Sequence, residues 1–107
     1  ILKGVPFMLH YVTSKGGVYA LTRCLANELG GDNICVNTLA PGLTMSEAVE
    51  AWGPEGDHDK GLVIAARAIQ REQVPDDLTG ACVFLSSPDS DFMTGQYVAV
   101  NGGDCFS

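Results

Sequence analysis

A short apolar segment at Ile34–Leu39 constrains the fold of this chain more than any other feature. It reads Ile-Cys-Val-Asn-Thr-Leu, which is rich in β-branched residues and apolar on both faces. That pattern is typical of a strand buried in a parallel sheet, with helices packed on either side. Pro41-Gly42 breaks the chain soon after it. We therefore expect an α/β fold in which this strand has neighbours in the sheet.

A helix is predicted before this strand, over about Tyr11–Leu29. Apolar residues recur there at spacings of three and four, which predicts a stripe that faces the core. The stripe consists of Val18, Leu21, Leu25 and Leu29. Gly30-Gly31 is expected to end the helix, and the opening segment Ile1–His10 is expected to be a loop.

Helices and one further strand are predicted in the second half of the chain. The expected helices are Ser46–Trp52 with Ser46 as its cap, about Asp57–Ala68 after a break at Gly53, Pro54 and Gly56, and a helix from Pro75-Asp76-Asp77 to about Ser86. The last element is a strand at Gln96–Val100. Helical crossovers between the strands predict parallel pairing. Two strands make a poor sheet alone, so we infer that the sheet continues in sequence outside these residues.

Composition excludes several classes of protein. The 107 residues are 46% hydrophobic, which argues for a globular segment rather than a disordered one. A net charge of -7 argues against nucleic acid and anionic membranes as partners. No apolar run reaches the roughly 18 residues of a membrane span, and no signal peptide is visible. A cytoplasmic location is expected.

The cysteines and histidines do not indicate a disulfide or a metal site. The four cysteines are scattered without a C-x-x-C pair, and three of them have apolar neighbours in the sequence, so we expect free thiols. His10 and His58 lack the spacing of zinc ligands. The cluster Asp57, His58 and Asp59 is interpreted as a charged helix start.

Tyr11 and Lys15 form the pair with the clearest chemical meaning. Four residues apart at the start of a helix, they share one face, one turn apart. A lysine ammonium near a phenol favours the phenolate, which suits a tyrosine to proton transfer at a carbonyl or alcohol oxygen. The spacing alone is weak evidence, since a helical tyrosine often packs on a lysine stem. Gly16-Gly17 follows inside the helix, where glycine costs about 1 kcal/mol each, and suggests close packing or approach of a ligand.

Three ordered motifs together resemble the classical short-chain dehydrogenase/reductase family. They are Tyr-Val-Thr-Ser-Lys-Gly-Gly from Tyr11, Val-Asn-Thr-Leu-Ala-Pro-Gly-Leu-Thr from Val36, and Thr-Gly-Gln-Tyr-Val-Ala-Val-Asn-Gly-Gly from Thr94. The resemblance covers essentially the whole chain. It implies a Rossmann-type, doubly wound parallel sheet, of which these residues supply only the C-terminal part, two strands plus helices.

The resemblance also implies roles for individual residues. Tyr11 would be the general acid/base, and Lys15 would lower the pKa of Tyr11 and bind the nicotinamide ribose. The segment Pro41, Gly42, Leu43 and Thr44 would contact the nicotinamide end of NAD or NADP, at a strand's carboxyl end. Asn37 and Ser14 match positions that we interpret as structural, with a local hydrogen bond for Ser14. Met45 and Trp52 fall where the family has its substrate lid, and substrate contact and simple packing are equally compatible with them.

Two parts of the family's pattern are missing from residues 1–107. No glycine-rich phosphate-binding loop follows a strand and opens a helix here, and the family's catalytic serine and asparagine would lie before Ile1. We interpret residues 1–107 as the C-terminal catalytic portion of one Rossmann-type domain whose N-terminal dinucleotide-binding half is absent. The expected parent is an NAD(P)-dependent alcohol dehydrogenase or carbonyl reductase with a small-molecule substrate, a homotetramer or homodimer. The alternative is a truncated, inactive fragment that acts only through oligomer or binding contacts. A third and weaker hypothesis keeps the fold but changes the chemistry to that of an epimerase or dehydratase.

Overall fold

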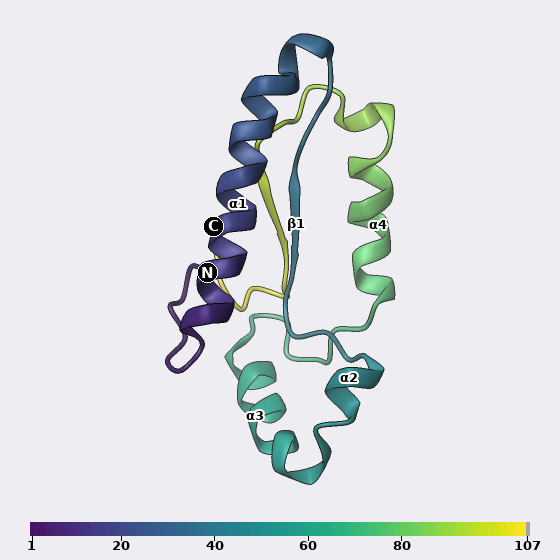
Figure 1. Ribbon diagram of the computed structural model, residues 1–107. Coiled ribbons are helices and arrows are strands. Elements are labelled where there is room, and N and C mark those ends of the chain that lie inside the picture. Colours follow the sequence, from purple (N-terminus) through teal and green to yellow (C-terminus); the bar gives the residue numbers. More distant parts are fainter. Residues whose placement is uncertain (107) are drawn as a thin grey trace.

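Two short parallel strands form the centre of the computed structural model (Figure 1). The structure describes residues 1–106, except the side chains of Glu55, Asp57 and His58. Strand β1 (Thr38–Pro41) pairs with β2 (Tyr97–Val100), with Thr38 opposite Tyr97 and Pro41 opposite Val100. The predicted α/β class and the parallel pairing are confirmed.

Helices flank these strands and extend beyond one end of them (Figure 1). Helix α1 (Leu9–Leu29) contacts β1, and α4 (Asp76–Leu85) contacts both strands. The short helix α2 (Glu47–Glu50) and the longer α3 (Gly53–Ala66) lie beyond the end of β1. Two 3₁₀ turns, η1 (Gly30–Asp32) and η2 (Pro88–Ser90), follow α1 and α4.

Several predicted boundaries are wrong for identifiable reasons. Helix α1 begins at Leu9, so His10 belongs to the helix and not to a loop. Helix α3 begins at Gly53 rather than Asp57, because Pro54 stands in its first turn, where the missing N–H of proline costs nothing. The predicted charged start at Asp57–Asp59 therefore falls inside the helix, and the side chains of Asp57 and His58 lie outside the described residues.

The first strand is shorter than predicted at its beginning, at Thr38 instead of Ile34. Side chains take part of the hydrogen bonding over this stretch: the Val36 N–H donates to Thr94 Oγ1 over 3.0 Å, while the Val36 carbonyl still accepts a main-chain bond from the Gly95 N–H over 2.7 Å. The Asn37 side chain donates to the Met93 carbonyl over 2.6 Å and accepts from the Gln96 N–H over 3.0 Å. Asn37 thus joins the segments that precede the two strands, which agrees with its predicted structural role.

The face of α1 that meets the strands differs from the predicted stripe. Val18 and Leu21 are 49% and 55% exposed, while Thr22 and Ala26 are buried. The Thr22 and Thr38 hydroxyls are hydrogen-bonded over 2.7 Å, and Thr22 also donates to the Val18 carbonyl. Leu25 and Leu29 are half-buried, so the buried face keeps two residues of the predicted stripe and adds a threonine whose hydroxyl finds these partners.

The described residues enclose very little apolar core. Among them, Ala26 is the one apolar side chain that is buried. The accessible surface is 7378 Å² for 11.3 kDa, against roughly 5,700 Å² expected for a compact monomer of that mass. Large apolar side chains on the helices and connecting segments are therefore left exposed among the described residues, such as Leu21 at 55% and Val83 at 62%.

The four cysteines are free thiols among the described residues, and none of them is buried as a small apolar residue would be. Cys24, Cys35 and Cys82 are exposed and Cys105 is partly exposed. Over residues 1–106, no helix combines the length and apolar character needed to span a membrane.

Replacement of Asn37 by alanine is expected to destabilise the full-length protein by about 1–2 kcal/mol, because two hydrogen bonds that join the strand entries are lost. Urea unfolding followed by circular dichroism measures this change. Asn27→Ala is the matched control, since Asn27 is exposed and only donates to the Arg23 carbonyl within α1. Equal unfolding free energies for the two variants would contradict the structural role of Asn37.

Candidate functional site

Chain direction brings the two predicted groups of site residues to one end of the sheet. The short turn η1 joins α1 to β1, so the helix and the strand run in opposite directions (Figure 1). The first turns of α1, with Tyr11 and Lys15, therefore lie at the carboxyl end of β1, where Pro41–Thr44 follows. Ligands bind at this end of the strands in open α/β sheets.

Tyr11 and Lys15 lie together, as their spacing predicts. The Lys15 Nζ is 5.5 Å from the centroid of the Tyr11 ring, within the range of a cation–π contact. Tyr11 is 48% exposed, so a ligand can reach the phenol. The Ser14 hydroxyl donates to the Tyr11 carbonyl over 2.8 Å, which is the local hydrogen bond expected of Ser14. The pair combines a phenol and an ammonium in a position open to a ligand.

The glycines that follow the pair have open space beside them. None of the described residues would come within 4 Å of a Cβ added at Gly16 or Gly17. The close packing that their position in a helix suggested is not found within residues 1–106, and approach of a ligand stays a prediction.

The segment Pro41–Thr44 is tightly held at the end of β1. The Gly42 N–H donates to the Val100 carbonyl over 3.0 Å, which extends the pairing of the strands by one residue. A Cβ at Gly42 would lie 2.8 Å from Gln73 Oε1 and 3.0 Å from Asn101 Cα. A side chain at residue 42 would require Gln73 or Asn101 to shift, so packing favours the glycine of the Pro-Gly motif.

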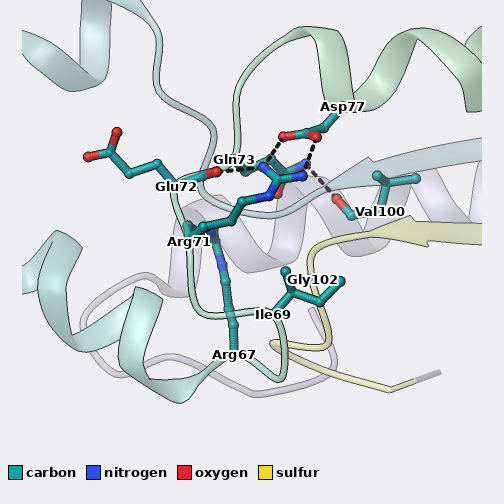
Figure 2. A pocket seen from close by; sticks show the side chains of 8 residues that line it. All are labelled: Arg67, Ile69, Arg71, Glu72, Gln73, Asp77, Val100 and Gly102. Atoms are coloured by element: carbon teal, nitrogen blue, oxygen red, sulfur yellow. Dashed lines mark hydrogen bonds and ion pairs between the residues drawn. The ribbon is translucent and has the colours of Figure 1, made fainter.

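A cavity of 130 Å³ lies beside this segment (Figure 2). Its lining comes from the chain after α3, the start of α4 and the end of β2: Arg67, Ile69, Arg71, Glu72, Gln73, Asp77, Val100 and Gly102. Tyr11 and Lys15 are not among these lining residues. The cavity therefore does not lie at this pair, and Arg67 and Gln73 connect its lining to the Pro41–Thr44 segment.

An ion pair closes one side of this cavity. Arg71 donates to both carboxylate oxygens of Asp77, over 2.7 and 2.6 Å (Figure 2). The hydrogen bond from Arg71, followed by one from the Val74 N–H, holds the pKa of Asp77 well below its usual 3.8, and the same pair raises the pKa of Arg71. Both charges are thus engaged with each other, and the pair anchors the start of α4.

Arg67 and Gln73 are site residues that the sequence reasoning missed. Both are buried and both touch the Pro41–Thr44 segment, although neither belongs to a motif. Arg67 follows the apolar run Leu62–Ala66, which is a weak sequence signal for burial, since Leu62 itself is 57% exposed. The sequence holds no comparable signal for Gln73.

Among the described residues, no group of three or more His, Cys, Asp or Glu side chains is placed to hold a metal ion.

The architecture and this end-of-strand site define part of a doubly wound α/β protein. The family model described as enoyl-(acyl carrier protein) reductase matches residues 1–104. The short-chain reductase protein NovJ of Streptomyces niveus is 36% identical over 105 residues, covering 94% of this chain and 40% of that protein.

Solved structures agree with the sequence matches. The structure of 4-hydroxyisoleucine dehydrogenase complexed with NADH has a TM-score of 0.84 at 27% identity, over 95% of this chain and 42% of that one. The blue fluorescent protein from a metagenomic library, in complex with NADPH, has a TM-score of 0.79 at 30% identity, over 90% and 37%.

The chain therefore belongs to the short-chain dehydrogenase/reductase family, and its fold is the Rossmann type expected from the motifs. It spans about 40% of the length of the curated relatives that it matches.

Gly42→Ala is expected to lower the unfolding free energy of the full-length protein by about 1–3 kcal/mol, since the added methyl overlaps Gln73 and the Asn101 backbone. Gly61→Ala is the matched control: Gly61 lies in α3 with open space beside it, and alanine there is expected to stabilise by about 0.5–1 kcal/mol. Thermal and urea unfolding measure both. Equal effects would contradict the packing at Gly42.

Asp77→Asn is expected to remove an acid-sensitive part of the stability. Because the pKa of Asp77 is lowered in the folded protein, its contribution is present above about pH 4 and is lost as pH falls toward the lowered pKa. The variant should be less stable than the parent at pH 7, and the difference should shrink in acid. Urea midpoints measured from pH 7 to pH 2 test this, and a pH-independent difference would contradict it.

Proposed function

We propose that the full-length protein is an NAD(P)-dependent oxidoreductase that transfers a hydride between the nicotinamide cofactor and an alcohol or ketone. The observation that carries the proposal is the Tyr11–Lys15 pair, at the same end of the sheet as Pro41–Thr44, in a member of the short-chain dehydrogenase/reductase family. Short-chain alcohol dehydrogenases and carbonyl reductases carry out this reaction.

In this proposal Tyr11 is the general acid/base at the substrate oxygen. Its phenol donates a proton when a carbonyl is reduced and accepts one when an alcohol is oxidised. Lys15 acts through its positive charge, which stabilises negative charge on the phenol oxygen, and it also binds the nicotinamide ribose. Both side chains project from the first turns of α1, so the rigid helix fixes their separation.

The residues present fit the nicotinamide end of NAD or NADP, which supplies the hydride acceptor or donor when bound. Pro41, Gly42, Leu43 and Thr44 place main-chain groups at the end of β1, where the glycine lets the backbone come close to its neighbours. The structures complexed with NADH and NADPH support both cofactors. Residues that would choose between them are not recognisable in residues 1–107.

We further propose that residues 1–107 form the C-terminal catalytic portion of one Rossmann-type domain, completed by an N-terminal dinucleotide-binding half. The uncovered apolar surface and the share of the relatives' length that the chain spans support this division. A small-molecule alcohol or carbonyl substrate, a homotetramer or homodimer and a cytoplasmic location complete the proposal.

A different function is favoured by one observation: residues 1–107 contain no glycine-rich phosphate-binding loop. On this alternative, the chain is a truncated, inactive fragment that acts through oligomer or binding contacts. Titrating the 107-residue chain with NADH and NADPH, followed by nucleotide fluorescence, separates the two ideas. Tight binding by this chain alone would argue against the inactive fragment.

Tyr11→Phe is expected to reduce kcat of the full-length protein by about 10²–10⁴-fold, because the proton at the substrate oxygen loses its carrier. Steady-state assays with NADH and NADPH against a panel of ketones and alcohols measure the change. Tyr19→Phe is the matched control on the same helix, since its hydroxyl accepts a hydrogen bond from Arg23 and its ring packs against Tyr97. Unchanged hydride transfer by Tyr11→Phe would show the mechanism to be wrong.

A further inference from the structure

Arg67 is a buried cation without a carboxylate partner. It is 3% exposed, and it forms no ion pair with any of the described residues. A buried charge is costly unless hydrogen bonds compensate it. Arg71, four residues later, shows the ordinary arrangement: it is exposed and bound to Asp77. The burial of Arg67 therefore requires a different explanation from general surface electrostatics.

The hydrogen bonds of Arg67 lead to the proposed cofactor segment. Its Nη2 donates to the Leu43 carbonyl over 2.6 Å, and its Nη1 donates to the Arg71 carbonyl over 3.1 Å. The buried Nε has no partner among the described residues. One guanidinium thus joins the Pro41–Thr44 segment to the chain that follows α3. A bond from a charged donor is stronger than one between neutral groups, and the planar fork fixes its direction.

Gln73 holds the same segment from a second side. It is 5% exposed, and its Nε2 donates to the Val100 carbonyl over 2.7 Å (Figure 2). The main-chain carbonyl of Gln73 accepts a hydrogen bond from the Met45 N–H over 2.7 Å, and Thr44 pairs with Gln73 in a parallel bridge. The Gln73 side chain is also the group that leaves no room for a Cβ at Gly42. The segment is therefore confined between the end of β2 and Arg67.

The position of the Leu43 carbonyl determines where the next amide points. A peptide unit is planar and trans, so its C=O and N–H project in opposite directions. With the Leu43 carbonyl bound by Arg67, the Thr44 N–H is directed away from Arg67. No described residue accepts a hydrogen bond from this N–H. The amide is thus held ready for an acceptor on a bound molecule.

We infer that Arg67 is a positioning residue for cofactor binding, which acts by holding the Leu43 carbonyl and so orienting the Thr44 amide, with Gln73 as its supporting neighbour. The inference rests on the proposed function, because it takes Pro41–Thr44 as the segment that contacts the nicotinamide end. Arg67 itself touches neither cofactor nor substrate. Main-chain carbonyls rather than a carboxylate compensate its buried charge, as suits a side chain that fixes one main-chain carbonyl from inside the protein.

The test compares the same substitution at Arg67 and at Arg71 in the full-length protein. Arg67→Met is expected to raise the Kd for NADH or NADPH about tenfold, as the loss of one bond from a charged donor implies. Arg71→Met, which removes the ion pair with Asp77 but no contact to Leu43, should leave Kd within about twofold of the parent. Nucleotide fluorescence gives Kd without turnover, and Tm without nucleotide reports the stability of each variant.

Two further measurements separate positioning from a general loss of stability. Arg67→Lys keeps the charge and one donor, so its Kd should lie between those of the parent and Arg67→Met. For Arg67→Ala, millimolar propylguanidinium should restore nucleotide affinity, whereas the same additive should not affect Arg71→Ala. The pH profile of kcat, which reports on Tyr11, should keep its shape in Arg67→Lys.

The outcomes distinguish this inference from the proposed function. An unchanged Kd in both Arg67→Met and Arg67→Lys would overturn the proposed role of Arg67. The same holds if Arg71→Met weakens nucleotide binding as much as Arg67→Met does. Neither result would affect the proposed function. Should Arg67→Met fail to fold, Arg67→Lys and guanidinium rescue decide the question. Unchanged turnover by Tyr11→Phe would overturn the proposed mechanism while leaving the binding result intact, and a parent protein that binds neither nucleotide would overturn both.

Discussion

The parallel pairing of β1 with β2 is the constraint on which the rest of the site depends. It joins residues 38–41 to residues 97–100, far apart in the sequence, and continues through the Gly42 N–H to Val100. This pairing places Asn101 against Gly42 and leaves no room for a side chain there. Because α1 must run back along β1, its first turns reach the same end of the strands. The strand pairing and the reversed direction of α1 together bring Tyr11, Lys15 and Pro41–Thr44 to one end of the sheet.

The two arginines near this region show how burial changes what a charge does. Arg71 is exposed and its partner is a carboxylate, so it anchors α4 in a solvent-screened environment. Arg67 is buried and its partners are two main-chain carbonyls, so its charge strengthens bonds that fix backbone geometry. One arginine therefore attaches a helix at the surface, and the other fixes the position of main-chain carbonyls in the interior.

Much of the fold could be predicted because its signals are local. Helix α4 begins beside Pro75, and Ser46 caps α2 by accepting from the Val49 N–H, both as the sequence indicated. The errors arose where distant residues compete with local preference. Ile34–Asn37 looks like a strand, yet Thr94 and the Asn37 side chain take hydrogen bonds that a ladder would use. The face of α1 turned toward Thr38 includes the buried Thr22, whose hydroxyl pairs with that of Thr38, a contact that polarity alone did not predict.

By itself, the sequence determined the order and type of the elements, the parallel class of the sheet, and the juxtaposition of Tyr11 and Lys15. Each of these follows from helical or strand periodicity, or from motifs whose residues are close together. The tertiary structure alone decided that Arg67 holds the Leu43 carbonyl and that Gln73 closes against Gly42. These contacts join residues 24 or more positions apart, and no local pattern records which carbonyl a buried side chain will meet.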